Sequence, residues 1–197
     1  VREGVINGNA SNAAGSGIDC GADPSKTVQW TESHDNHKDN GTRFVSEHNI
    51  NKTWALVAAR ANAMSLYLAR PSSMGIKLGT ASTNTGWDWE EVVAVNKFHN
   101  DFAGQSEYIS NSNGYAMVER GTTGAVIVNV GSDGNVNIPV HKMANGTYTD
   151  QISGNTFTVS NGRISGKISH QCGYAVIYNS CNHSWTAGTT TAATCTN

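Results

Sequence analysis

The chain has 197 residues, and its 13 basic and 15 acidic residues give a formal net charge of −2 at neutral pH. Charged residues make up only 14% of the chain, below the roughly 25% of an average globular protein. Because there is no basic field to attract a polyanion, nucleic acid is not an expected partner. No apolar run approaches the roughly 18 residues of a membrane-spanning helix, so membrane insertion is not expected.

Strand-like and helix-like segments alternate before about residue 105. A short helix is expected within 2–15, a strand at 28–33, a polar loop at 34–41, and a second strand at 64–69, where Pro71 stops it. The spacing also predicts two helices. The first begins after an N-cap at Ser46 and buries Ile50, Trp54, Val57, Ala58 and Ala61. The second covers 88–103, is capped by Asp88, ends at Gly104, and turns inward Val92, Val95, Phe102 and either Phe98 or His99.

Short alternating runs separated by turn residues dominate after residue 105. Pairs such as Asn145-Gly146 and Asn161-Gly162 between such runs are typical of hairpins. This part therefore predicts an antiparallel sandwich. Its expected strands are 115–120, 125–130, 136–140, 156–159, 163–168 and 174–178.

Four cysteines occur, at positions 20, 172, 181 and 195, with no Cys-x-x-Cys pair that would indicate zinc. At least one disulfide is expected, although sequence cannot choose among three full pairings, and free thiols are the alternative. Residues 181–197 are interpreted as a linker or the start of another module, with a Cys181–Cys195 loop as one option. Asp39, Asp88 and Asp133 lack the spacing of a calcium loop, so no metal is expected in this segment.

The sharpest candidate for chemistry is the run Trp-Thr-Glu-Ser-His-Asp at 30–35. A predicted strand delivers a carboxylate and an imidazole at its carboxyl end, where active sites of parallel α/β proteins assemble. Asp35 beside His34 can bind a sugar diol or stabilise a developing cation. The alternative is that the two residues only cap a turn.

Weaker candidates each have a structural alternative. The loop residues His37, Lys38 and Asp39 can reach a substrate or remain solvated charge. Arg70 can lie at the rim of the site or form a structural ion pair. The tryptophans at positions 87 and 89 can stack on sugar rings or pack beneath a loop.

Several ordered blocks resemble bacterial α-amylases of glycoside hydrolase family 13. Residues 28–35, V-Q-W-T-E-S-H-D, are similar to the family's V-x-W-x-E-S-H-D segment on the seventh barrel strand. Residues 54–60 resemble the following helix, 66–71 the eighth strand, and 92–100 the last barrel helix. The resemblance covers roughly 28–180. Met64-Ser65 departs from it, since the family often has proline at the start of strand eight.

The resemblance implies a fold and a division of the chain. Residues 1–104 would be the C-terminal portion of a (β/α)8 TIM barrel, and 105–180 an antiparallel Greek-key β-sandwich, domain C. It also implies retaining hydrolysis of α-1,4-glucosidic bonds in starch and related glucans by a secreted or cell-surface bacterial enzyme. Asp35 matches the family's transition-state-stabilising aspartate, and His34 matches the neighbouring histidine that contacts the same sugar.

The family's nucleophile and general acid lie on earlier barrel strands, and nothing before residue 28 resembles their motifs. The chain alone is therefore expected to be inactive and to need a missing N-terminal barrel segment, from the same or a separate chain, as its partner. No cofactor is expected within this segment, whereas the family's usual calcium ligands belong to the missing part. Two alternatives stay open: a non-catalytic starch-binding or scaffold module, and another family 13 enzyme acting on α-glucans.

Overall fold

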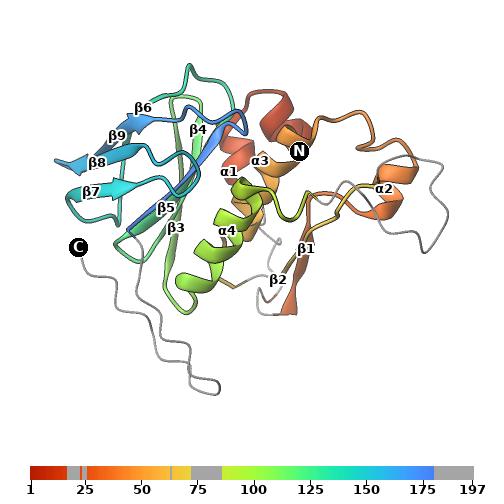
Figure 1. The fold of residues 1–197 in the computed structure, drawn as a ribbon, viewed down its shortest axis with the longest axis horizontal. Coiled ribbons are helices and arrows are strands. Elements are labelled where there is room, and N and C mark those ends of the chain that lie inside the picture. Colours follow the sequence, from red (N-terminus) through yellow and green to blue (C-terminus); the bar gives the residue numbers. More distant parts are fainter. Residues whose placement is uncertain (17–22, 24–25, 63, 72–85, 180–197) are drawn as a thin grey trace.

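Helices dominate the first half of the chain, and two antiparallel sheets make up the second (Figure 1). The structure is a computed structural model that describes residues 1–16, 23, 26–62, 64–71 and 86–179. Its helical elements are η1 (Arg2–Ile6), α1 (Ala10–Ala14), α2 (His34–Lys38), α3 (Glu47–Ala58) and α4 (Glu90–Asp101). Its strands are β1 (Val28–Trp30), β2 (Met64–Leu66), β3 (Glu107–Ser112), β4 (Tyr115–Arg120), β5 (Gly124–Asn129), β6 (Asn135–Pro139), β7 (Gly146–Thr149), β8 (Thr156–Ser160), β9 (Arg163–Lys167) and β10 (Tyr174–Tyr178).

The strands β1 and β2 pair in parallel, in a register that runs from Val28 opposite Met64 to Trp30 opposite Leu66. Helices α2 and α3 lie between them in the chain, which gives the parallel crossover that the sequence predicted. The predicted N-cap of α3 is confirmed, because the Ser46 hydroxyl accepts a hydrogen bond from the Asn49 N–H at 3.3 Å.

Three predictions for the helical half are wrong. Helix α3 ends at Ala58, so Ala61, which was expected on its buried face, lies beyond the helix and is only partly buried. The polar loop expected at 34–41 contains helix α2, which Ser33 caps by accepting the Asn36 N–H at 3.3 Å. A five-residue helix is too short to show apolar periodicity, and this hid it from the sequence reading. The N-cap of α4 is Trp89, without a side-chain cap bond, and not Asp88. The inward face of α4 is confirmed, since its four predicted apolar positions are fully buried: Val92, Val95, Phe98 and Phe102.

The second half forms two four-stranded antiparallel sheets, with strand orders β10-β5-β4-β3 and β6-β9-β8-β7. The six predicted strands are present, whereas β3 and β7 were not predicted. The expected Asn161-Gly162 hairpin is confirmed, with φ values of 50° and 72° that fit a tight two-residue turn. The hairpin expected at Asn145-Gly146 is wrong, because Gly146 begins β7, which pairs with β8, whereas the preceding strand β6 pairs with β9.

In the sheet β10-β5-β4-β3, the strands β4, β5 and β10 are buried on both faces, whereas the edge strand β3 is partly exposed. Along β4, Tyr115 and Met117 pack into the cluster shared with the second sheet, whereas Ala116 and Val118 pack into the cluster shared with α1, α3 and α4. This alternation follows from the two-residue period of a strand. One apolar cluster therefore runs across the predicted domain boundary at 104/105, and that division stays a prediction.

Polar contacts also connect the helices to this sheet. Arg120, fully buried at the end of β4, donates to the carbonyls of Ala59 at 2.8 Å and Phe102, which are the C-caps of α3 and α4. A guanidinium at two helix C-termini satisfies free carbonyls and opposes the negative ends of both helix dipoles. Arg60, just after α3, pairs with Glu107 of β3 at 2.8 Å.

Of the cysteines, Cys172 is a buried free thiol, and burial raises its pKa to about 12. Cys20, Cys181 and Cys195 lie outside the described residues, as does the tail at 181–197. Among the helices of the described residues, none has the length and hydropathy that crossing a bilayer requires.

Candidate functional site

The predicted pair His34–Asp35 lies in the first turn of α2, just beyond the carboxyl end of β1. His34 Nε2 is 3.3 Å from Asp35 Oδ1, and 84% and 71% of the two side chains are exposed. The structure therefore brings the two predicted site residues together on the surface. Both carboxylate oxygens of Asp35 can accept hydrogen bonds from an incoming hydroxyl-rich ligand.

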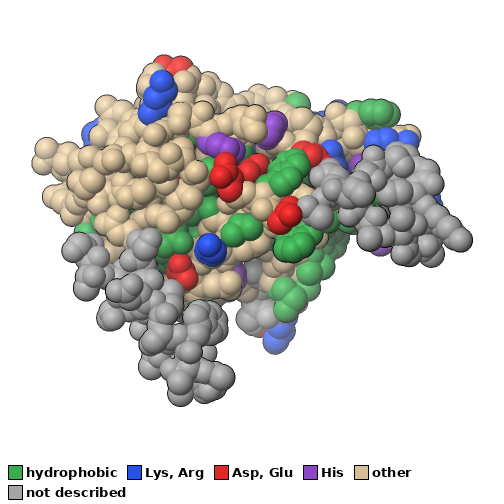
Figure 2. Space-filling view, viewed as in Figure 1, with side chains coloured by type: hydrophobic (Ala, Val, Ile, Leu, Met, Phe, Trp, Pro, Cys, Tyr) green, Lys and Arg blue, Asp and Glu red, His purple; other side chains and the backbone are tan. Residues whose placement is uncertain are grey.

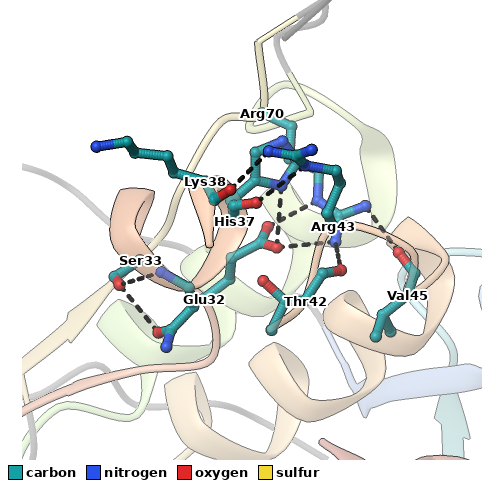
Figure 3. Close-up of polar contacts among 9 residues, drawn as sticks. Glu32, Ser33, His37, Lys38, Thr42, Arg43, Val45 and Arg70 are labelled. Atoms are coloured by element: carbon teal, nitrogen blue, oxygen red, sulfur yellow. Dashed lines mark hydrogen bonds and ion pairs between the residues drawn. The ribbon is translucent and has the colours of Figure 1, made fainter. Parts of the chain in front are cut away.

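A buried ionic cluster lies beside this exposed pair (Figure 3). Glu32 is only 2% exposed and receives two hydrogen bonds from Arg70, at 2.7 and 2.9 Å. His37 Nδ1 lies 3.3 Å from the same carboxylate. Because Arg70 follows β2, this cluster ties the carboxyl ends of the two parallel strands together. Of the two alternatives that the sequence left open for Arg70, the structure shows the ion pair.

Burial by itself would raise the pKa of Glu32, but the hydrogen bonds and charge of Arg70 outweigh it, and the pKa lies below its ordinary value. The bidentate geometry explains this outcome, because two parallel N–H groups meet both carboxylate oxygens. The cluster is therefore an ion pair at neutral pH.

Two arginines hold the backbone that follows α2. Arg70 donates to the carbonyls of Val45 at 2.8 Å and Thr42 at 3.1 Å. Arg43 donates to the carbonyls of His37 at 3.3 Å and Lys38 at 2.6 Å, at the C-terminal end of α2. These bonds fix the C-terminal end of α2 and the segment that follows it, so the helix carrying Asp35 is anchored although the aspartate side chain is exposed.

The weaker candidates divide between surface and interior. Lys38 and Asp39 are exposed at the end of α2, as expected of solvated charge, whereas His37 faces Glu32 and is 8% exposed. Trp87 is 57% exposed, and Trp89 packs partly against the core beside α4. Among the described residues, no group of three histidine, cysteine, aspartate or glutamate side chains is placed to hold a metal ion.

Sequence reasoning missed Glu32 as the organising residue of the site. The sequence did carry a signal for Glu32. A glutamate shortly after one parallel strand and an arginine shortly after the next are expected to lie at the same end of the sheet. The sequence motif pointed to the exposed pair His34 and Asp35, and the buried carboxylate of Glu32 was therefore overlooked.

No family model matches the sequence. The chain is 36% identical over 182 residues to an α-amylase of Clostridium acetobutylicum, a match that covers 91% of this chain and 23% of that protein. It is 30% identical over 164 residues to an α-amylase of Butyrivibrio fibrisolvens, covering 75% of this chain and 17% of that protein. The resemblance to α-amylases is confirmed. The chain spans less than a quarter of the length of either relative.

A solved structure supports the same relationship at the level of fold. The crystal structure of α-amylase I from Eisenia fetida aligns with a TM-score of 0.56 at 16% identity, over 77% of this chain and 41% of that chain. At this identity the likeness concerns the fold alone. The chain therefore resembles part of an α-amylase both in sequence and in the arrangement of its elements.

Proposed function

We propose that the chain is part of a family 13 α-amylase that hydrolyses α-1,4-glucosidic bonds of starch with retention. The observation that carries the proposal is the 36% identity to an α-amylase over 91% of the chain. The position of Asp35 supports it, because an exposed carboxylate just beyond a parallel strand is where barrel enzymes place their chemistry.

We further propose that residues 1–104 are the last part of a (β/α)8 barrel and that residues 105–180 are domain C. Parallel sheets are normally covered on both faces. Here the sheet has two strands in the described residues, and it exposes 41–65% of four large side chains, namely Val28, Trp30, Met64 and Leu66. Hydrophobic side chains also gather over β1 and β2 in Figure 2. Further barrel strands would pair with and cover this sheet.

The proposed reaction assigns a limited role to this chain. Retaining hydrolysis needs a nucleophile and a general acid about 5–5.5 Å apart. Both are assigned to barrel strands outside these 197 residues, on the same or a separate chain. Asp35 accepts hydrogen bonds from hydroxyls of the sugar at the cleavage point, and these strengthen as the ring flattens toward the transition state. His34 contacts the same sugar and orients it.

A setting outside the cell or on its surface is part of the proposal. The surface is low in charge and rich in amide and hydroxyl side chains, which suits an environment of neutral polysaccharide. The calcium common in the family is assigned to the part of the enzyme outside this sequence.

The proposal is tested by assembly. The chain is purified alone and also co-expressed with barrel strands one to six of the Clostridium relative, and reducing-sugar release from soluble starch is measured for each. We expect no release from the chain alone and release from the assembled pair. Hydrolysis by the chain alone would contradict the proposed division of the catalytic carboxylates. Starch binding by an assembled pair that never hydrolyses it would favour the alternative of a non-catalytic starch-binding module.

A further inference from the structure

A pocket lies between helices α3 and α4 at the start of strand β2. It has a volume of about 240 Å³, and its walls come from the C-terminal halves of the two helices and the first two residues of β2. The two helices pack against each other in Figure 1. The pocket is at the opposite end of the parallel sheet from Asp35. It is lined by Trp54, Ala58, Met64, Ser65, Asn96, His99 and Asn100.

The indole of Trp54 is buried at this pocket without a polar partner. The residue is 2% exposed, and its Nε1 has no hydrogen-bond partner among the described residues. The ring packs edge-to-face against Tyr67 at a centroid distance of 5.1 Å, which holds the indole in place. Buried N–H groups are normally hydrogen-bonded, because an unpaired donor loses its water without compensation. Trp54 is therefore ready to donate to an acceptor brought by a partner.

The other polar groups of the pocket include acceptors. His99 Nδ1 lies 2.8 Å from the Ala58 carbonyl, which can only accept, so Nδ1 carries the proton and Nε2 of the neutral ring is left as an acceptor. The exposed amides of Asn96 and Asn100 each add donors and an acceptor. A donor on Trp54 and an acceptor on His99 match the carbonyl and the N–H of a peptide backbone.

The pocket favours an uncharged occupant. No lysine, arginine, aspartate or glutamate is among the described residues that line it. A charged ligand would lose part of its hydration there without forming an ion pair. The side chains of Trp54, Ala58 and Met64 add apolar surface. A stretch of polypeptide with small or apolar side chains meets both conditions.

The topology of the small sheet indicates which polypeptide would reach the pocket. Within the described residues, β2 pairs with β1 alone, so its other edge is unpaired. In the proposed barrel, closure pairs that edge with barrel strand one, parallel to β2. Parallel neighbours begin at the same end of a sheet, so strand one would begin near Met64, whose side chain is 65% exposed. The chain that leads into strand one would therefore pass the pocket.

We propose that this pocket receives the polypeptide that immediately precedes barrel strand one, which we call the leading segment. A backbone carbonyl of the leading segment accepts the Trp54 Nε1–H, and a backbone N–H donates to His99 Nε2. The inference rests on the proposed function, because it takes barrel strand one as the neighbour of β2. It adds to the strand pairing a second contact, between the helices, that holds the missing part of the enzyme to this chain.

The test uses the full 197-residue chain assembled with barrel strands one to six of the Clostridium relative, made with and without the leading segment. A photo-crosslinking residue is introduced as Asn100→benzoylphenylalanine, and the control is Asn145→benzoylphenylalanine. Both asparagines are exposed, but Asn145 precedes β7 in the second sheet and does not line the pocket. Mass spectrometry identifies the crosslinked peptides, and dilution followed by size exclusion gives the dissociation constant of the assembled pair.

We expect crosslinks from position 100 to fall in the leading segment, and none from position 145 to reach it. The double variant Asn96→Ala/Asn100→Ala should weaken the assembled pair by about tenfold, whereas Asn145→Ala should leave it unchanged.

Two results would overturn the proposal while starch hydrolysis by the assembled pair persists. They are crosslinks from position 100 that fall outside the leading segment, and a dissociation constant that does not change when the leading segment is removed. Parts that never associate would instead overturn the proposed function, so the two failures are distinguishable.

Discussion

Glu32 and Arg70 are 38 residues apart in the sequence and form a buried bidentate ion pair at 2.7 and 2.9 Å. The pair joins the segments that follow β1 and β2, and it lies beside the turn that presents Asp35. The backbone that carries the exposed carboxylate of Asp35, to which we assign a catalytic role, is therefore held in place by a buried ion pair.

Replacing Asp35 tests its assigned role directly. In the assembled enzyme, Asp35→Asn should keep the fold and reduce kcat steeply with a smaller change in KM, because the lost interaction is strongest in the transition state. His34→Ala should cost less, about 1–3 kcal/mol of transition-state stabilisation. Steady-state kinetics on maltoheptaose would measure both. Unchanged turnover in Asp35→Asn would show that the aspartate has another role.

Removing Arg70 should destabilise the chain far more than removing Arg43. Arg70→Met leaves the buried Glu32 carboxylate without its partner, at an expected cost of about 3–5 kcal/mol in the free energy of unfolding. Arg43→Met removes bonds to backbone carbonyls near the surface and should cost about 1 kcal/mol. Urea unfolding followed by circular dichroism would compare them. Equal losses in the two variants would refute the special position of Arg70.

The chain should lose stability in acid through two carboxylates. Burial opposes ionisation of Glu32 and Glu107, but bonds from Arg70 and Arg60 respectively outweigh it and lower both pKa values. A lowered folded-state pKa contributes stability that is present above the unfolded value of about 4.3 and is lost as the pH falls through the folded pKa. Urea midpoints between pH 7 and pH 3 would show this fall.

A glutamine variant isolates the contribution of one carboxylate to that pH dependence. Glu107→Gln should be less stable than wild type at pH 7. Its urea midpoint should fall less between pH 5 and pH 3, because glutamine cannot take up the proton that the glutamate binds on unfolding. If the urea midpoints of the variant and the wild type fell equally between pH 5 and pH 3, Glu107 would not contribute to the pH dependence of stability.

Residues 1–104 alone should fail to form a cooperative fold. In the full chain, α1, α3 and α4 pack against the sheet β10-β5-β4-β3 through one apolar cluster, and a fragment without that sheet exposes the cluster to water. We expect aggregation or a molten state, seen by size exclusion and near-ultraviolet circular dichroism. A sharp calorimetric transition of the fragment would contradict this.

Gly124 of β5 should tolerate no side chain. A Cβ at this position would lie 2.3 Å from Phe102 Cζ, at the end of α4. Gly124→Ala should therefore cost about 1–3 kcal/mol through overpacking. Gly146→Ala is the matched control, because its nearest neighbour would be at an ordinary 3.6 Å. Similar melting temperatures for the two variants would show that Phe102 can move aside.

The elements that the sequence predicted well are those with strong local signals. Ser46 correctly predicted the start of α3, and apolar spacing correctly predicted the buried face of α4. The pair Asn161-Gly162 correctly predicted a hairpin. The strand β3 was missed because its residues 107–112 are mostly partly exposed and polar and show no apolar alternation. The N-cap of α4 was predicted at Asp88 and lies at Trp89. Local propensity led to the wrong residue, because aspartate is a preferred N-cap and tryptophan is not.

The site was half predictable from the sequence. His34 and Asp35 were found through a motif, and the structure places both side chains at the surface, whereas their chemical roles stay proposals. The pocket beside Trp54 was not predicted, because its lining comes from three segments spread from residue 54 to residue 100. Only tertiary packing brings such residues together, and no local pattern reports it.

The contact of Arg120 with both helix ends limits how this chain can be recombined with other proteins. A chimera that exchanged the sandwich at residue 105 would replace the guanidinium that donates hydrogen bonds to the C-cap carbonyls of α3 and α4. Unless the incoming module brought an arginine to the same place, both helices would end in unsatisfied buried carbonyls. A successful graft would therefore have to transfer the two helices together with the sheet, so the unit of exchange is larger than the sandwich.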